Sequence, residues 1–262
     1  MAEERKEEPR YKVDTTKEVI EAKKKAAKGK GITFKPYIED VRTRTSILKE
    51  KQQEIINVPA SEKLVARTRS MGKLLARERL NLLFDEGAFD EYAVWAKSQI
   101  KAFGMEQYKT PADGVVCGFG KVDGRVVAAY STDYSVLAGA IGEGGTIKMT
   151  SLYRMAGQWR VPLVQFIDSA GGRMHEALHV LRPVAEYFHY QSIYSGIIPQ
   201  ISINCRGCAA GQAYGPLLCD FTFFSRKGGD MWLGGPRATM GVTTAEDITG
   251  IGESRSPISA NG

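Results

Sequence analysis

Two short glycine-containing turns carry the residues whose types and spacing best suit chemistry. Each follows an apolar run typical of a strand and precedes a predicted helix: Asp168-Ser-Ala-Gly-Gly-Arg173 and Gly207-Cys-Ala-Ala-Gly211. Small residues let a ligand approach the main chain, and the N–H groups at a helix start point outward with a favourable dipole. Two such turns on adjacent parallel strands would direct two donors at one point, which suits a carbonyl oxygen that gains negative charge. Close packing of helix on sheet would use the same glycines, so both roles stay open.

A second pattern is typical of a zinc site. His175-Glu176-Ala-Leu-His179 places two histidines one helical turn apart, with a glutamate that could activate water. No third ligand is obvious, because His189 and Glu186 stand at unusual spacings, and five-residue matches arise by chance. We therefore favour a chance match on an amphipathic helix and keep a zinc metallohydrolase as an alternative.

The remaining nucleophilic or metal-binding side chains show weaker patterns. Cys205 and Cys208 lack the second pair that a zinc ribbon needs, so we expect small buried thiols, as for Cys117 and Cys219. Ser169 lacks the Gly-x-Ser-x-Gly arrangement of a nucleophile elbow. Nucleophilic catalysis by a side chain is therefore not expected.

The elements that position the two turns are predicted to be strands and helices in alternation. A hairpin is expected around Asp123-Gly124, which supplies the positive φ angles of a tight turn. A glycine-rich loop over 139–145 leads into a predicted helix over 146–158, and a helix bent at Pro183 is expected from 174 to about 195. The strands are predicted over 161–167, 199–204 and 220–225. This succession indicates an α/β fold whose parallel strands are joined by right-handed crossovers.

The N-terminal part differs in composition from the rest. Residues 1 to about 110 are rich in lysine and glutamate with helical periodicity, whereas the remainder is rich in glycine, so a boundary is expected near Pro111. Helices are predicted from Asp14 or Thr15 to Lys28, from Tyr37 to Asn57, and from Leu74 to Phe84.

Length and composition bound the class of protein. The chain has 262 residues, 43% apolar and 25% charged, which are the proportions of a soluble globular protein. Its net charge of +6 favours anionic partners, but the densest basic run, Lys23 to Lys30, contains no aromatic residue, so no nucleic-acid ligand is expected. There is no long apolar run, and the charged N-terminus is followed by no apolar segment. We expect no membrane span, no secretory signal and a cytoplasmic location.

A series of segments in a fixed order carries a family pattern. It begins at Lys73-Leu-Leu-Ala-Arg-Glu-Arg-Leu-Asn-Leu-Leu-Phe-Asp85 and continues through Ala112-Asp-Gly-Val-Val-Cys-Gly-Phe-Gly-Lys-Val-Asp-Gly124. The later segments are 133–143, 168–173, Pro199-Gln-Ile-Ser, 207–216 and Gly234-Gly-Pro236. Over residues 72 to about 250 the chain resembles the carboxyltransferase (beta) subunits of biotin-dependent acyl-CoA carboxylases. The resemblance implies a crotonase-like ββα superhelix with mostly parallel strands, preceded by an N-terminal helical segment.

The resemblance also implies a mechanism. The thioester carbonyl of an acyl-CoA would rest on main-chain amides while its α-carbon becomes an enolate, which takes up carbon dioxide released from N-carboxybiotin. The biotin oxygen freed on release would remove the α-proton, so no side-chain base is needed. By position, the catalytic donors are the amides of Gly172 and of Ala210 or Gly211. The substrate-binding residues are Gly139, Gly171 and Arg173.

Arg173 is open to two roles. It could bind an anionic part of the substrate, in which case Arg173→Ala is expected to weaken acyl-CoA binding and leave the fold intact. It could equally form an ion pair at the start of the following helix.

The chain departs from the family pattern at both turns. It has Ser169-Ala-Gly-Gly-Arg173 where the family usually has Ser-Gly-Gly-Ala-Arg, and Ala209-Ala-Gly211 where Ala-Gly-Gly is usual. Alanine and glycine both donate an N–H, but Ala210 would resist a positive φ. The departure leaves the selectivity for the acyl chain undetermined.

The resemblance implies partners. The family carries a second, similar lobe that binds biotin, and the chain stops at Gly262 before such a lobe could fit. We expect half a carboxyltransferase completed by another polypeptide, or else a truncated chain. Residues 72–262 would form the acyl-CoA lobe and residues 1–71 a basic helical extension that serves in docking. The cofactor would be biotin, as carboxybiotin on a partner biotin carboxyl carrier protein. Biotin carboxylase would be a further partner in an oligomer, with no metal in this chain.

Two further alternatives use the same fold. A biotin-dependent acyl-CoA decarboxylase runs the same chemistry in reverse, and because the transition state is shared the sequence does not fix the direction. A non-catalytic scaffold subunit would keep the fold without an active site.

Overall fold

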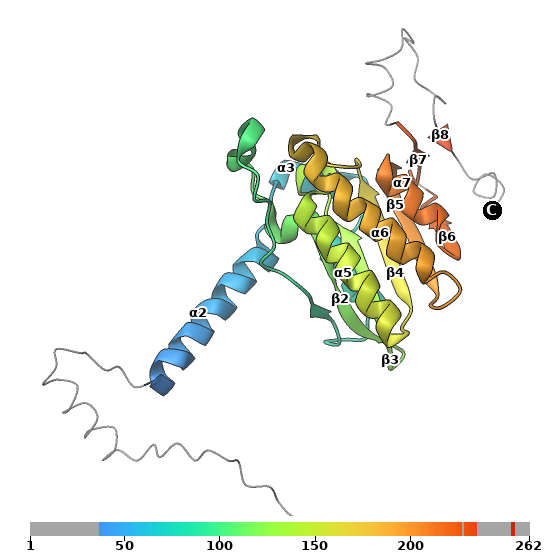
Figure 1. Ribbon diagram of the computed structural model, residues 1–262. Coiled ribbons are helices and arrows are strands. Elements are labelled where there is room, and N and C mark those ends of the chain that lie inside the picture. Colours follow the sequence, from blue (N-terminus) through green and yellow to red (C-terminus); the bar gives the residue numbers. More distant parts are fainter. Residues whose placement is uncertain (1–36, 227, 235–252, 255–262) are drawn as a thin grey trace, which may run out of the picture. The chain divides into compact units, whose positions relative to one another are not determined.

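The computed structural model describes residues 37–226, 228–234 and 253–254 (Figure 1). Within it, the helix predicted over 37–57 is confirmed as α2 (Tyr37–Asn57). The helix predicted over 14–28 lies outside the described residues.

Packing divides the chain into two compact units, Met1–Gln53 and Glu54–Gly262. The change in composition near Pro111 lies inside the second unit, so the boundary predicted there is wrong. The change reflects a switch from helical segments to the long strands of the sheet, because short apolar runs and glycine turns replace helical periodicity after this point.

A mixed sheet forms the centre of the second unit. Its strands are β1 (Asp90–Glu91), β2 (Val115–Val122), β3 (Arg125–Thr132), β4 (Leu163–Ser169), β5 (Gln200–Ala209), β6 (Phe221–Phe224), β7 (Met231–Trp232) and β8 (Glu253–Ser254). Among the described residues their order is β1-β2-β3-β4-β5-β7-β8, with β6 also paired to β5. β3, β4, β5 and β6 pair in parallel, which confirms the predicted α/β fold with mostly parallel strands.

The predicted hairpin is confirmed between β2 and β3. Its antiparallel register ends at the pair Val122 and Arg125, and the turn residues Asp123 and Gly124 have φ angles of 50° and 76°. The Asp85 carboxylate accepts hydrogen bonds from both turn amides at 3.0 Å. These bonds fasten the hairpin to the chain just after the helix Ala76–Leu83.

Helices cover both faces of the sheet. The elements are α3 (Glu62–Ser70), α4 (Ala76–Leu83), α5 (Glu143–Trp159), α6 (Leu181–Ile193) and α7 (Gly211–Leu217). Figure 1 shows α5 and α6 side by side across one face. One core cluster lies on that face around Tyr130, Met149 and Ile167. A second lies on the other face, where Leu80 of α4 and Phe84, directly after α4, pack on β2 and β3. None of the helices in the described ranges has the length and apolar character that crossing a membrane requires.

The segment after the first turn differs from the prediction. A single bent helix was expected from 174 to about 195, but a 3-10 helix over Met174–Val180 precedes α6. Pro183 stands in the first turn of α6, where its missing N–H breaks no hydrogen bond of the helix, so it does not bend α6 as predicted. β5 also continues to Ala209, past the predicted end at 204.

The four cysteines are free thiols, as predicted; the predicted burial is confirmed for Cys117 and Cys208, whereas Cys205 and Cys219 are partly exposed. Cys208 packs in the core cluster on the α5 face, whereas Cys205 packs against the α4 cluster, so the two side chains point to opposite faces of β5. Burial raises the pKa of the Cys117 thiol to about 11 and that of Cys208 to about 12.

We expect these two thiols to resist alkylation in the native protein. At pH 8 iodoacetamide should leave Cys117 and Cys208 unmodified over minutes, because the thiolate is the nucleophile and only a very small fraction of either group is ionised at that pH. Peptide mass spectrometry before and after unfolding in urea measures this, and all four cysteines should react after unfolding. Rapid native labelling of Cys208 would contradict its burial.

Candidate active site

The two glycine-containing turns lie side by side at one edge of the sheet. The first begins with the last two residues of β4 and the second with the last three residues of β5, and these strands are parallel neighbours paired as far as Ser169 and Cys208. Gly171 of the first turn packs on the second, because a methyl group added to Gly171 would lie 3.0 Å from the Ala209 carbonyl oxygen. The sequence expectation that the turns adjoin is therefore confirmed.

The first turn is held by hydrogen bonds on both sides of Gly172. The Ser169 hydroxyl donates to the Gly139 carbonyl at 2.7 Å and accepts from the Gly171 amide at 3.1 Å. The Arg173 amide donates to the Ile141 carbonyl at 2.8 Å. The Gly172 amide between them has no acceptor within the described residues, and Gly172 lines the cavity. Gly172 is thus a donor available to a ligand.

The second turn leaves one of its two candidate amides available. The Ala210 amide donates to the Trp232 carbonyl at 3.1 Å, so of the two expected donors, Ala210 and Gly211, Ala210 is corrected. Gly211 begins α7, and its amide has no acceptor in the described part of the chain. Ala210 adopts a φ of 51° although alanine resists positive values, and its bond to β7 opposes relaxation of this strained backbone.

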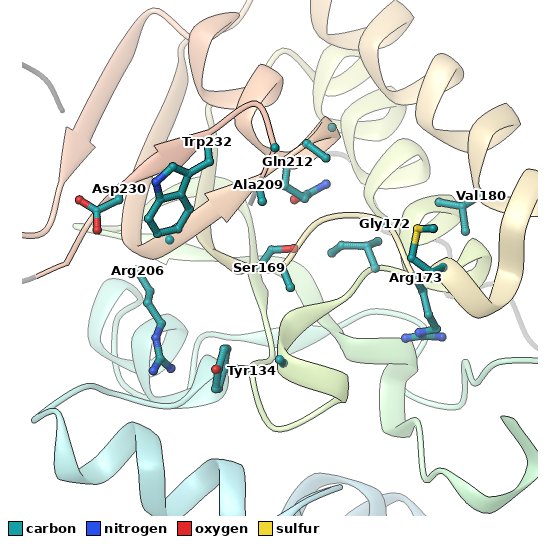
Figure 2. A pocket seen from close by; sticks show the side chains of 18 of the residues that line it. Tyr134, Ser169, Gly172, Arg173, Val180, Arg206, Ala209, Gln212, Asp230 and Trp232 are labelled. Carbon is teal, nitrogen blue, oxygen red and sulfur yellow. The ribbon is translucent and has the colours of Figure 1, made fainter. Parts of the chain in front are cut away.

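Both amides border a cavity of about 1290 Å³ (Figure 2). Its wall is mainly apolar and includes Ile141, Val180, Leu181, Val184 and Trp232. This volume exceeds the roughly 300–1,000 Å³ of a pocket for a drug-sized ligand. The cavity therefore has room for a ligand much longer than the group that two amides can hold.

The charged guanidinium of Arg173 is not exposed to this cavity. Its guanidinium is fully buried and pairs with Asp113 and Glu176, both at 2.6 Å. The ion-pair role is thus the one present, and the predicted contact of Arg173 with an anionic part of the substrate is wrong for this structure. Sequence reasoning missed Asp113 because it lies 60 residues away from its partner.

The two carboxylates that hold Arg173 also hold the start of α5. Asp113 accepts from the Gly145 amide, and Glu176 accepts from the Glu143 amide. Burial raises the pKa of Asp113 above its usual value despite Arg173. Burial also acts to raise the pKa of Glu176, but the hydrogen bonds it accepts and Arg173 together lower that pKa. Arg173 thus joins the first turn to α5 through charged groups.

A second buried ion pair supports the same turn from the opposite side. Arg79 of α4 donates to the Asp168 carboxylate at 2.8 Å, and both side chains are almost entirely buried. Asp168 directly precedes Ser169 in β4. Burial raises the pKa of Asp168, and Arg79 opposes this shift. The Ala-Arg-Glu-Arg helix therefore positions the end of β4.

Gly139 lies beneath the first turn. It has a φ of 72°, and a methyl group there would fall 2.1 Å from the Asp168 carbonyl oxygen. It is buried and is not among the residues that line the cavity, so its place is that of a close approach between backbones.

The structure does not place the residues of the His-Glu-x-x-His pattern as a zinc site requires. His175 and His179 lie in a 3-10 helix, where residues four apart are rotated by about 120° from each other. Glu176, the residue that would activate water, is almost fully buried and bound by Arg173. The match to the zinc pattern is a chance one, as favoured above.

Comparisons with known proteins show which family the chain belongs to. The family described as Carboxyl transferase domain matches residues 67–252, so the chain belongs to that family. A crystal structure of transcarboxylase 12S, with methylmalonyl-coenzyme A and methylmalonic acid bound, superposes with a TM-score of 0.73 at 36% identity, over 79% of this chain and 40% of the other. The predicted resemblance and the crotonase-like fold are confirmed.

Curated relatives include enzymes of both reaction directions. The chain is 40% identical to the methylmalonyl-CoA decarboxylase subunit alpha of Propionigenium modestum, over 77% of this chain and 40% of the relative. It is 35% identical to the propionyl-CoA carboxylase beta chain of Cereibacter sphaeroides, again over 77% and 40%. The chain thus spans about 40% of the length of these relatives.

Proposed function

We propose that this chain is the acyl-CoA-binding half of a carboxyltransferase that moves a carboxyl group from carboxybiotin to the α, or vinylogous, carbon of an acyl-CoA. The observation that carries the proposal is the pair of available amides, Gly172 and Gly211, on adjoining turns beside a large apolar cavity. Membership of the carboxyl transferase domain family supports the reaction class.

The two amides supply the electrostatic part of the mechanism. The thioester carbonyl binds between Gly172 and Gly211, and its oxygen gains negative charge as the α-carbon becomes an enolate. A preorganised donor at such an oxygen is worth about 2.7–4 kcal/mol in the transition state. Once a partner covers the exposed apolar wall, water is excluded from the site, which strengthens both hydrogen bonds and protects the enolate. Carboxybiotin, when bound, supplies the carbon dioxide and then the oxygen that takes the α-proton.

A second carboxyltransferase lobe on another polypeptide would complete the site. Met174 and Leu181 line the cavity and are 87% and 59% exposed, which is unusual for large apolar side chains and suits cover by a partner. We propose further that a biotin carboxyl carrier protein and biotin carboxylase join this chain in an oligomeric assembly. In this proposal residues 72–262 form the acyl-CoA lobe, and residues 1–71 dock onto a partner.

The decarboxylase alternative uses the same residues. The methylmalonyl-CoA decarboxylase relatives favour keeping it, because the enolate is common to both directions. The direction depends on the partner that charges or discharges biotin.

Isolation of the assembly from cells that express the tagged full chain tests the proposal. We expect a second lobe-sized carboxyltransferase polypeptide and a biotinylated protein to co-purify. The assembly should transfer labelled carboxyl groups from malonyl-CoA or methylmalonyl-CoA to biotin. ATP-dependent fixation of labelled bicarbonate would indicate carboxylation, and transfer without it decarboxylation. An active lone chain, or an assembly inactive with both thioesters, would count against the proposal.

A further inference from the structure

The position of the Gly211 amide depends on contacts made one turn further along α7. Gly211 is the first residue of this helix, and Gly215 follows four residues later, about 6 Å along the helix axis. Figure 1 shows α7 beside α6, and the two helices are in contact. Because one turn of α-helix moves as a unit, a shift of α7 at Gly215 is also a shift of the Gly211 amide.

The side chain of Tyr187 in α6 lies directly against Gly215. A methyl group added at Gly215 would lie 2.3 Å from the Tyr187 hydroxyl oxygen and 3.3 Å from the ring carbon that carries this oxygen. Only a hydrogen atom fits between them, so the hydroxyl group limits how closely α7 approaches the core. Gln191, one turn after Tyr187, donates to the Gly215 carbonyl at 2.6 Å. α6 therefore both limits and holds the position of α7 at this residue.

Tyr187 is itself fixed in the core. Its hydroxyl donates to the side-chain oxygen of Gln165 at 3.0 Å and lies 3.1 Å from the Tyr130 hydroxyl. Gln165 and Tyr130 are paired neighbours on β4 and β3, and all three side chains are buried. The Tyr153 ring packs edge-on against that of Tyr187, with 5.3 Å between the ring centres. A group that intrudes at Gly215 must therefore displace α7, because the tyrosine side chain has no space to yield.

α7 is the side of this contact that can move. Tyr214 and Leu217 are 41% and 68% exposed, so one side of the helix faces solvent. A methyl group at 2.3 Å is about 1 Å closer than 3.4 Å, where ordinary van der Waals contact begins. An outward movement of that size would displace the Gly211 amide, whereas the Gly172 amide belongs to the other turn, which has its own hydrogen bonds.

We infer that Tyr187 is a positioning residue for carboxyl transfer: its hydroxyl group sets the position of α7, and α7 in turn sets the Gly211 amide relative to the Gly172 amide. Tyr187 does not line the cavity, so it acts through the helix and not on the substrate. The inference rests on the proposed function, because the charge that the two amides would share arises only in that reaction.

An exchange of the two contacting groups tests the inference. Gly215→Ala is expected to lower kcat of the co-purified assembly by about 100-fold, the cost of a misplacement of about 1 Å. KM for the acyl-CoA should change much less, because the amides act on charge that develops in the transition state. Tyr187→Phe should lower kcat by less than about 10-fold, since it removes the contact without forcing α7 outward and leaves Gln165 with Tyr130 as a donor.

The double variant carries the decisive expectation. In Gly215→Ala with Tyr187→Phe, the added methyl group takes the space of the removed hydroxyl group, 3.3 Å from the nearest ring carbon. Its kcat should exceed that of Gly215→Ala at least about 10-fold. Recovery should be incomplete, because Pro216 disfavours helical backbone at a preceding alanine.

Gly157→Ala is the matched control. Gly157 also lies in a helix, α5, and a methyl group there would lie 2.3 Å from the ring of Tyr194, so the same kind of clash arises away from the site. Gly157 does not line the cavity. This variant should lose stability in thermal unfolding and keep the wild-type kcat, as a purely structural effect requires.

Two kinetic results would overturn the inference. One is a wild-type kcat in Gly215→Ala, and the other is a double variant no faster than Gly215→Ala. If Gly215→Ala does not fold, Tyr187→Phe is compared with wild type, and an equal kcat for these two would overturn the inference as well.

Crystal structures of the variants distinguish this failure from failure of the proposed function. A wild-type assembly that transfers no carboxyl group counts against the proposed function, and the structures then test the positioning role. In Gly215→Ala the Gly211 nitrogen should lie about 1 Å further from its wild-type place relative to the Gly172 nitrogen, and in the double variant it should return. An unchanged separation of the two nitrogens in Gly215→Ala would show that Tyr187 does not set it.

Discussion

Arg173→Met is expected to lower the free energy of unfolding by about 3–5 kcal/mol. The substitution keeps an apolar stem of similar length but removes the charge that Asp113 and Glu176 share in a fully buried position. Both carboxylates then face the interior without a cation, and an unpaired buried charge costs more than a lost surface pair. This replaces the expectation from sequence that Arg173→Ala leaves the fold intact.

The loss of unfolding free energy in Arg173→Met should depend on pH in a defined direction. Burial already raises the pKa of Asp113, and without Arg173 that pKa should rise further. A carboxyl group whose pKa is higher in the folded than in the unfolded state favours folding below the unfolded pKa and loses that advantage as pH rises through the folded pKa. The variant should therefore be closest to wild type at pH 4–5 and furthest from it at pH 8.

Urea unfolding at pH 5 and pH 8 measures both effects. Arg182→Met is the matched control, because Arg182 forms an exposed pair with Glu186 and is 89% exposed. The control should change stability by no more than about 0.5 kcal/mol at either pH. Combining Arg173→Met with Asp113→Asn should recover part of the lost stability, since the double change removes the stranded charge. A loss below about 1 kcal/mol for Arg173→Met would show that the pair is not the support described.

The sequence predicted the elements whose signals are local. The Asp123-Gly124 hairpin depends on two adjacent residues that accept positive φ, and the bounds of α2 follow helical periodicity ended near Pro59. The alternation of strand, glycine turn and helix was sufficient to predict parallel strands and two adjoining turns. These features are set by neighbours in the chain, so one sequence is enough to find them.

The features that the sequence did not predict depend on distant partners. The sequence left Arg173 open to substrate binding or to an ion pair, and the distant Asp113 decides for the ion pair. It also left the donor as Ala210 or Gly211, and β7 decides this by accepting a hydrogen bond from the Ala210 amide. Helical periodicity also gave no sign that 174–180 would form a 3-10 helix. Contacts of this kind arise from tertiary packing, which single-sequence patterns do not carry.

Gly171→Ala is expected to lower kcat for carboxyl transfer by about 100- to 1,000-fold, the cost of losing one oxyanion donor. Gly171 has a φ of 100°, and an added methyl group would lie 3.0 Å from the Ala209 carbonyl oxygen and 3.3 Å from the Ala210 Cβ. Either the neighbouring turn then gives by a few tenths of an ångström or the backbone at Gly171 leaves its positive φ, and both changes displace the Gly172 amide relative to that of Gly211. Because both amides act on charge that develops in the transition state, KM for the acyl-CoA should change much less than kcat.

Gly196→Ala is the control that distinguishes the effect of displaced amides from the effect of backbone strain alone. Gly196 has a φ of 72°, so alanine carries a similar backbone penalty there, but nothing lies within 4 Å of the added methyl group and the site is elsewhere. Steady-state transfer by the co-purified assembly, together with thermal unfolding of each variant, compares the two. Both variants should lose stability from the positive φ, Gly171→Ala more because of its close contacts, but only Gly171→Ala should lose activity. If both retained wild-type kcat, the amides would not be the groups that stabilise the enolate, because separating them would then have no effect on the barrier.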